Sequence, residues 1–327
     1  MKEVRLNPVN NCYVIFSEDR AYRPSYYKFQ NQILKNSVCP FCAGNEDMTP
    51  PAVLTIDRDD GSGWSVRVVP NKYPALDPNG QINYNNEGMK YSLSGTGGHE
   101  VVIETSRHET SITGLDIEEI EQVINAYTVR YTLLAEDRNQ VYGMIFKNSG
   151  PFAGTSVEHT HTQLLALPVM PGEAAREIFN ASIHFEKTGN CIFCEMISIE
   201  LKDDSRIVAG NENFIAFCPY ASRFPFEVWI IPMDHNSHFE MMRETKRSDL
   251  AEILKTTLSR LEMEIKDCSY NYYIHTMPFR TEKSGSYHWH IEITPRTAFV
   301  GGFELGTDMY INHIYPENAA DKLRNNI

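Results

Sequence analysis

The residues best suited to chemistry lie in one short pattern, His159-Thr160-His161-Thr162-Gln163. Side chains alternate along an extended segment, so both histidines and the glutamine are expected on one face. A neutral imidazole can attack phosphorus, and a carboxamide can donate a hydrogen bond to a phosphoryl oxygen as its charge changes. A pair of histidines satisfied inside a strand is an equally open interpretation, because short motifs often mislead.

A glycine-containing turn and two arginines could bind phosphate near this pattern. The turn follows an expected buried strand at 141–146, and in it Ser156 and the backbone amides around Gly154 could cradle phosphate oxygens. Arg20 and Arg23 stand three residues apart before a proline, and a guanidinium group matches phosphate oxygens in shape. Such arginine pairs are also common in solvated loops, so this pair alone does not define a site.

Two C-x-x-C pairs, each followed by histidines far downstream, predict two zinc sites. Two thiolates and two imidazoles make a common tetrahedral structural site. The fold would have to gather these ligands from separate strands, and the metal would then stabilise it. Redox dithiols or simply buried thiols are the alternatives, and the βαβ unit with a C-x-x-C at its helix start that a redox motif needs is not found. The first set is Cys39, Cys42, His108 and His159, and the second is Cys191, Cys194, His235 and His288.

If His159 binds metal, His161 stays free two residues further on. One of its ring nitrogens could then attack while a hydrogen bond holds the other. The imidazole is a nucleophile only while neutral, so activity should fall below its pKa. His161 could instead be a core histidine or a third metal ligand.

The order of features occurs twice along the chain, which indicates internal duplication. Each copy reads C-x-x-C, strand, histidine, helix, strand and then two histidines separated by one residue. The helices are expected at 116–137, capped by Asp116, and from Ser248 or Asp249 to about residue 266. We therefore expect an α+β fold, a tandem duplication with antiparallel sheets and packed helices, in halves 1–170 and 171–327.

Composition limits the class of protein and its partners. The chain has 327 residues, seven cysteines and a formal net charge of −13. That charge disfavours nucleic acid and anionic membranes as partners. No signal-like or membrane-spanning run of apolar residues is found, and residues 76–98 look like a surface loop. The expected location is the cytoplasm.

In several ordered segments the chain resembles the galactose-1-phosphate uridylyltransferase branch of the histidine-triad superfamily. The resemblance is close to the plant-type relatives, which include ADP-glucose phosphorylase. The segments span nearly the whole chain and are 20–24, 39–45, 66–74, 148–163 and 301–307.

This resemblance implies a duplicated histidine-triad fold, a homodimer and a ping-pong reaction. His161 would attack the α-phosphorus of a nucleotide sugar and form a nucleotidyl-histidine, from which a phosphate-bearing acceptor takes the nucleotide. Gln163 would support the transferring phosphoryl group, and Ser156 would contact the distal phosphate. The other expected substrate-binding residues are Arg20, Arg23, Asn71, Asn148, Gly154 and Glu304.

The resemblance also implies an alternative second metal site. Bacterial uridylyltransferases build theirs from one glutamate and three histidines. This set and the cysteine set both claim His288, and the cysteine set is preferred because thiolates hold zinc firmly. Thr307-Asp308 also stands where relatives often continue Thr-Gly, which leaves the acceptor open. The alternative ligands are Glu177, His275, His288 and His290.

Three functions follow from these residues. The leading one is exchange between UDP-glucose and galactose 1-phosphate by a hexose-1-phosphate uridylyltransferase. The second is a phosphorylase that uses inorganic phosphate on ADP-glucose or a diadenosine polyphosphate. The third is a zinc-stabilised nucleotide-binding protein without turnover.

Overall fold

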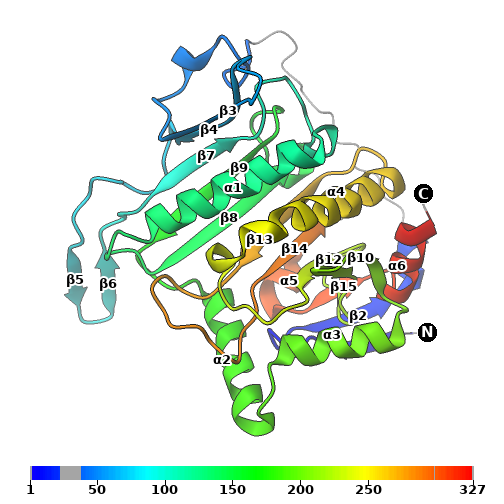
Figure 1. Ribbon diagram of the computed structural model, residues 1–327. Coiled ribbons are helices and arrows are strands. Elements are labelled where there is room, and N and C mark those ends of the chain that lie inside the picture. The colour runs from blue at the N-terminus through cyan, green and yellow to red at the C-terminus, as the bar shows by residue number, and fades with distance from the viewer. Residues whose placement is uncertain (1, 23–37, 298, 326–327) are drawn as a thin grey trace.

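The computed structural model describes residues 2–22, 38–297 and 299–325. Within these residues, ten strands form one antiparallel sheet through the middle of the molecule, in the order β10-β11-β12-β14-β13-β8-β9-β7-β4-β3 (Figure 1). The first half contributes β3 (Leu54–Asp57), β4 (Trp64–Pro70), β7 (His99–Ile103), β8 (Tyr142–Ser149) and β9 (His161–Leu167). The second half contributes β10 (Ile207–Gly210), β11 (Phe214–Phe217), β12 (Val228–Pro232), β13 (Tyr270–His275) and β14 (His290–Pro295).

The strand order is the same in both halves when it is followed from the outer edge inward. The first half runs β3-β4-β7-β9-β8 and the second runs β10-β11-β12-β14-β13. The expected α+β fold with a tandem duplication is therefore confirmed. The two copies share one sheet, because the innermost strands β8 and β13 pair with each other, with Ile145 opposite Ile274.

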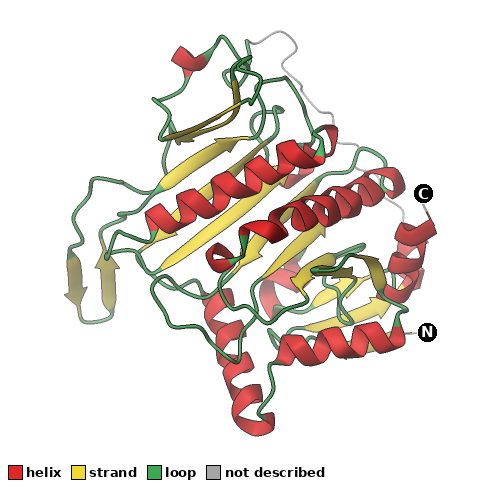
Figure 2. Cartoon of the chain, in the orientation of Figure 1, coloured by secondary structure: helices red, strands yellow, loops and turns green. Residues whose placement is uncertain are grey.

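Two helices, one from each half, lie side by side across one face of this sheet (Figures 1 and 2). They are α1 (Ile117–Leu134) and α4 (Arg247–Glu264). Their apolar stripes, which include Ile120 of α1 and Leu254 of α4, join a single cluster of buried side chains from both halves. Because burial of apolar surface is the main favourable term in folding, this shared core ties the halves together.

The helix starts differ between the two copies. The prediction for α1 is confirmed, since Asp116 and Glu119 form a capping box. For α4 the predicted helix is present but its predicted cap was wrong: the helix begins at Arg247 and has no side-chain cap. A 3-10 helix, η6 (Glu244–Lys246), runs directly into α4, so the residues expected as caps are already helical.

The opposite face of the sheet is covered mainly in the second half. There α2 (Gly172–Thr188) and α3 (Ile192–Asp203) pack over β11 and β12 through a second apolar cluster. A small sheet flanks them, made of β1 (Lys2–Leu6), β2 (Tyr13–Ser17) and β15 (Tyr310–Asn312). The remaining helices are α5 (Gly302–Thr307), α6 (Pro316–Asn325), η1 (Glu18–Tyr22), η2 (Glu46–Met48), η3 (Ile112–Gly114), η4 (Pro151–Ala153) and η5 (Phe239–Met241).

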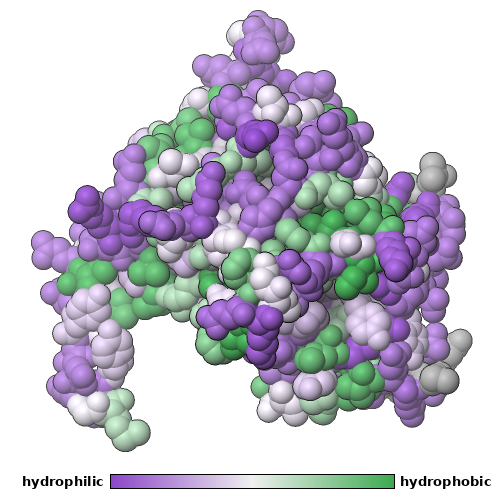
Figure 3. All heavy atoms as spheres, turned by 60° about the horizontal axis from the view of Figure 1, so that its bottom comes forward, coloured by the Kyte–Doolittle hydropathy of each residue, from purple (hydrophilic) through white to green (hydrophobic). Residues whose placement is uncertain are grey.

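The segment expected as a plain surface loop contains a β-hairpin that projects from the body (Figures 1 and 3). It consists of β5 (Tyr84–Glu87) and β6 (Lys90–Leu93), with Gly88 at a positive φ of 65° in the turn. Nearly all its side chains are exposed, so no alternation of apolar residues marks the strands. Among the described helices, none is both long and apolar enough to cross a membrane.

Candidate active site and metal centres

The catalytic candidate His161 is the first residue of β9, on the face away from α1 and α4. Its Nδ1 lies 2.8 Å from the carbonyl oxygen of His159. A carbonyl oxygen can only accept, so Nδ1 carries the proton and Nε2 keeps its lone pair. Burial lowers the pKa of His161, which favours the neutral imidazole. The ring of Phe41 packs against it at 5.3 Å. The ring therefore has the tautomer that a nucleophile needs.

Gln163 follows on the same face, and its amide has a defined orientation. The backbone N–H of Ala75 donates to Nδ1 of His99 at 3.0 Å, so Nε2 of His99 carries the proton. That Nε2 donates to Oε1 of Gln163 at 2.8 Å, and Asn71 donates to the same oxygen at 3.4 Å. The NH2 group of Gln163 is therefore left to donate to a phosphoryl oxygen. His99 was not singled out in the sequence, because a lone histidine at a strand start carries no distinguishing signal.

The expected phosphate-binding turn connects β8 to the histidines. Gly154 lies in the left-handed region, with a φ of 86°, and is exposed together with Ser156. In β8, Phe146 stands opposite Gln163, and continuing this register by two residues places Asn148 opposite His161. Side chains alternate along a strand, so Asn148 shares with Phe146 the face of the sheet that carries His161 and Gln163.

Two other expected substrate-binding residues are not brought to His161 by any described contact. Arg20 is exposed in η1, and the Glu304 carboxylate accepts a hydrogen bond from the backbone N–H of Gly301 at the start of its own helix. Arg23 lies outside the described residues. These roles stay predictions.

Asp308, which stands where relatives often have glycine, has a backbone conformation that is typical of glycine. Asp308 is the C-cap of α5 and has a positive φ of 55°, a conformation that glycine adopts most easily. Its carboxylate forms an ion pair with Arg176 at 2.6 Å.

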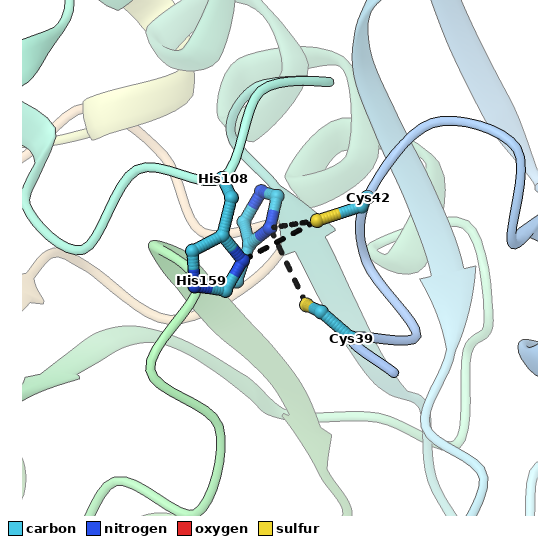
Figure 4. Close-up of side chains that lie close together, drawn as sticks. All are labelled: Cys39, Cys42, His108 and His159. Atoms are coloured by element: carbon cyan, nitrogen blue, oxygen red, sulfur yellow. Dashed lines mark hydrogen bonds between the residues drawn. The ribbon is translucent and has the colours of Figure 1, made fainter. Parts of the chain in front are cut away.

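The first metal set is gathered from three separate loops (Figure 4). The ligand atoms of Cys39, Cys42, His108 and His159 all lie within 4.8 Å of one another. Sγ of Cys42 is 3.3 Å from Nδ1 of His108, and Sγ of Cys39 is 3.6 Å from Nδ1 of His159. Tetrahedral zinc, with bonds of about 2.3 Å to sulfur and about 2.0 Å to nitrogen, would separate these atoms by roughly 3.5 Å. The donor set therefore fits zinc.

Protonation in this set also suits a metal. The Nε2 atom of His159 lies 2.9 Å from the carbonyl oxygen of Thr105, so it carries the proton and Nδ1 faces the cluster. Burial lowers the pKa of His159 to about 4, so the ring is neutral near pH 7. A neutral imidazole is the form that binds zinc.

The second metal set repeats this arrangement in the other half. Its four ligand atoms also lie within 4.8 Å of one another, in Cys191, Cys194, His235 and His288. Nδ1 of His235 is 3.4 Å from Sγ of Cys194, and Nε2 of each histidine lies next to a backbone carbonyl oxygen. The hydrogen bond from Cys194, together with those from the two histidines, lowers the pKa of Cys191 and favours its thiolate.

The alternative metal set does not compete with this one, contrary to the expectation from the sequence. His288 lies with the cysteines, 3.7 Å from Sγ of Cys194. A third buried cluster contains Glu177, His275 and His290, with Glu292 as its fourth member in place of His288. Some of its charges are paired within the protein, since His275 contacts Glu177 at 2.6 Å and Arg223 contacts Glu292. Oε1 of each glutamate and Nε2 of His290 are buried without a hydrogen-bond partner among the described residues.

The second half contains a closed counterpart of the catalytic histidine. His290 follows His288 as His161 follows His159, and its Nδ1 lies 3.2 Å from the His288 carbonyl oxygen. Phe193 of the second C-x-x-C packs against His290 at 5.0 Å, as Phe41 packs against His161. His290 is 0% exposed, whereas His161 is 7% exposed. Of these two equivalent positions, substrate can therefore reach His161 more readily.

The duplicated sheet, with His161 next to a Cys2His2 cluster, is the arrangement expected from the sequence for a nucleotidyltransferase. Residues 1–171 match the family model for the N-terminal domain of galactose-1-phosphate uridyl transferase, and residues 177–326 match the model for its C-terminal domain. The chain belongs to this family and is an enzyme, a nucleotidyltransferase. The interpretation without turnover is thereby set aside.

Two curated relatives are similar over nearly their whole length. The chain is 38% identical to ADP-glucose phosphorylase of Arabidopsis thaliana, over 98% of this chain and 92% of the relative. It is 28% identical to galactose-1-phosphate uridylyltransferase of Thermotoga maritima, over 99% of this chain and 98% of the relative.

The structure is also similar to solved structures of the same two kinds of enzyme. A crystal structure of an ADP-glucose phosphorylase from Arabidopsis thaliana with bound ADP-glucose has a TM-score of 0.87 and 35% identity, covering 99% of this chain and 98% of that one. A uridylyltransferase structure has a TM-score of 0.77 and 27% identity, covering 99% and 97%.

Proposed function

We propose that the chain transfers an adenylyl group from ADP-glucose to inorganic phosphate and so releases glucose 1-phosphate and ADP. The observation that carries this proposal is the 38% identity to an ADP-glucose phosphorylase over 98% of the chain, against 28% to a uridylyltransferase. The structural similarities favour the same choice, with TM-scores of 0.87 and 0.77.

The proposed reaction has two steps at His161. In the first, Nε2 bonds to the α-phosphorus and the bond from that phosphorus to the bridging oxygen breaks, so glucose 1-phosphate leaves. In the second, an oxygen of inorganic phosphate attacks the same phosphorus and the P–N bond breaks, which releases ADP and restores the neutral imidazole. Gln163 and Asn148 donate amide hydrogen bonds to the phosphoryl oxygens, where charge accumulates in both transition states.

Zinc is the proposed metal for both Cys2His2 sets. A bound zinc ion supplies a fixed tetrahedral cross-link between loops that are far apart in the sequence. The chain's own part is to hold His159 through Thr105, so that the His159 carbonyl oxygen orients the ring of His161. The proposed role of the metal is therefore structural: it helps to position His161 and does not contact the substrate.

Exchange between UDP-glucose and galactose 1-phosphate is the second candidate. It is favoured by the family models, which match residues 1–171 and 177–326 under the uridyl transferase description. The base and the acceptor distinguish the two candidates.

Labelled substrates separate the candidates directly. The protein is incubated with ADP-glucose or UDP-glucose, each carrying 32P at the α-phosphate, and acid-labile label on the protein is counted. The proposal predicts label from ADP-glucose that inorganic phosphate removes as ADP. Label from UDP-glucose alone, removed by galactose 1-phosphate, would establish the second candidate instead.

We also propose a homodimer in the cytoplasm, with no nucleic acid or membrane partner. Apolar patches on the face in Figure 3 support the dimer, as do exposed Phe179 and Phe185 of α2 and Met89 at the hairpin tip. All seven cysteines are free, as is usual for proteins in reducing compartments. Sedimentation at micromolar concentration tests the dimer, and a monomer would contradict it.

A further inference from the structure

We propose that Asn271, which belongs to the second half, is a positioning residue for the transfer at His161 in the first half. The inference rests on the proposed function. It holds that Asn271 sets the direction of the Asn148 amide and anchors the turn that precedes the catalytic histidine.

A row of polar side chains crosses four neighbouring strands on the substrate face of the sheet. In β13, Asn271 stands opposite Asn148 of β8 on one side and Thr294 of β14 on the other. The paired register of β8 with β9 ends with Phe146 opposite Gln163, and the same register carried two residues further would set Asn148 opposite His161. Strands lie about 4.8 Å apart, so this register would set Asn271 about 10 Å from His161, with Asn148 between them.

The hydrogen bonds of Asn271 fix the orientation of both amides. Its Nδ2 donates to Oδ1 of Asn148 at 2.8 Å and to the carbonyl oxygen of Ala153 at 2.9 Å. The Ala153 oxygen can only accept, so the NH2 group of Asn271 must face this side. Asn148 therefore presents its oxygen to Asn271 and turns its own NH2 group away. Among the described residues no acceptor takes that NH2 group, which leaves it for a phosphoryl oxygen.

The same strand start holds the turn between β8 and the histidines. The backbone N–H of Phe152 donates to Oγ of Ser269 at 3.4 Å, next to the bond from Asn271 to Ala153. Gly150 has a φ of 81°, and a Cβ there would lie 2.4 Å from Oγ of Ser269. The turn is thus packed tightly against β13, and this packing sets where the amides around Gly154 point.

Asn148, Asn271 and Thr294 of this row line a cavity, so Asn148 is not part of a closed core. Its volume is about 480 Å³, within the range of small-molecule sites. Arg296 also lines this cavity, with its guanidinium over the ring of Phe224 at 5.4 Å. Other lining residues include Tyr273 and Tyr310.

The test is a double-mutant cycle on the rate at which His161 takes label from ADP-glucose in a single turnover. Asn271→Asp keeps the shape but replaces the NH2 donor with an acceptor, so Asn148 should turn its own NH2 group toward it. We expect Asn271→Asp to label His161 about 10- to 100-fold more slowly, since one oriented donor at a transition state contributes factors of this order or larger. The KM for ADP-glucose should change little.

A matched control separates positioning from folding. Asn312→Asp changes a buried asparagine of the small flanking sheet that, like Asn271, donates to a backbone carbonyl oxygen, here that of Ser222 at 2.9 Å. Because Asn312 is fully buried and Asn271 only partly, it should lower thermal stability at least as much as Asn271→Asp does, with labelling at the wild-type rate. The double variant Asn148→Ala/Asn271→Asp should lose less than the product of the two single losses, because one residue acts through the other.

The outcomes distinguish this inference from the proposed function. Wild-type labelling by Asn271→Asp, or a double variant whose loss equals the product of the single losses, would overturn the role of Asn271 alone. A wild-type protein that takes no label from ADP-glucose would overturn the proposed function and this inference with it.

Discussion

At the scale of single residues, fixed backbone carbonyl groups determine where the protons of the site lie. The His159 carbonyl oxygen accepts from Nδ1 of His161 at 2.8 Å, and the Thr105 carbonyl oxygen lies 2.9 Å from Nε2 of His159. Neighbouring histidines are thereby held in opposite tautomers. One presents Nδ1 to a metal and the other presents Nε2 to substrate.

The pH dependence of labelling tests this description of His161. Burial lowers its pKa from an ordinary value of 6.5, so the ring should stay neutral at lower pH than a free imidazole. Protonation removes the lone pair, so the labelling rate should fall only as pH drops through that lowered pKa. Single-turnover labelling between pH 4.5 and 8, with rates normalised to pH 8, should give an acid limb with its midpoint below 6.5. A midpoint at or above the ordinary value would contradict the burial of the ring.

At the scale of elements, a buried ion pair fixes the strand that carries the histidines. Nζ of Lys147 in β8 lies 2.6 Å from the Glu104 carboxylate, which follows β7. It also donates to the hydroxyl of Thr160 at 2.8 Å and to the carbonyl oxygen of His161 at 3.1 Å. Both charged side chains are almost fully buried, at 1% and 0% exposure. Lys147 thus connects β8 to the end of β7 and to the start of β9, where His161 lies.

Breaking this pair should be strongly destabilising. Lys147→Met leaves Glu104 buried without its partner, which is expected to lower the free energy of unfolding by about 3–5 kcal/mol. Lys322→Met is a matched control, since it removes a half-exposed partner of Glu264 3.6 Å away and should cost less than about 1 kcal/mol. Urea unfolding measures both. Equal effects would show that the buried pair does not stabilise the strands.

The two metal sets connect loops that lie at the ends of strands. Each ties a C-x-x-C segment to histidines beside the central sheet, so metal removal should loosen both halves. We expect two zinc ions per chain by elemental analysis, and a melting temperature that falls by several degrees or more after chelation and recovers when zinc is restored. His108→Ala should reduce the content toward one ion. A chelated protein with an unchanged melting temperature would contradict a structural role for zinc.

Several elements could be predicted from the sequence, and those that were missed have physical reasons for leaving no signal in it. The apolar stripes of α1 and α4 could be predicted because helical spacing is a local pattern in the chain. The metal sets could be predicted because cysteine and histidine are typical zinc ligands. The hairpin around Gly88 was missed because its strands bury no face. His99 and Asn271 act through hydrogen bonds to distant residues, which no spacing in the chain reveals.

At the scale of the whole molecule, the copies are joined into one sheet with one core. The pairing of β8 with β13 connects residues far apart in the chain, so no local pattern could reveal it. We propose that 1–170 and 171–327 are copies of one unit and not independent folding units. The single apolar cluster that includes Ile120, Leu254 and Ile274 supports this.

Separation of the halves tests this proposal. A fragment of residues 1–170 would expose the edge of β8 and the apolar side of α1, so it should be unfolded or aggregated when expressed alone. The intact chain loaded with zinc should unfold in one transition by circular dichroism and by tryptophan fluorescence. A soluble fragment with a cooperative transition of its own would contradict the shared core.

The most direct test of the central claim is to locate the covalent nucleotide. After a brief incubation with ADP-glucose, the protein is digested at neutral pH and its peptides are analysed by mass spectrometry. We expect an adenylyl group on the peptide that contains His161, none on the peptide with His290, and none anywhere in His161→Asn. An adduct that persists in His161→Asn, or that sits on another residue of the wild-type chain, would contradict it.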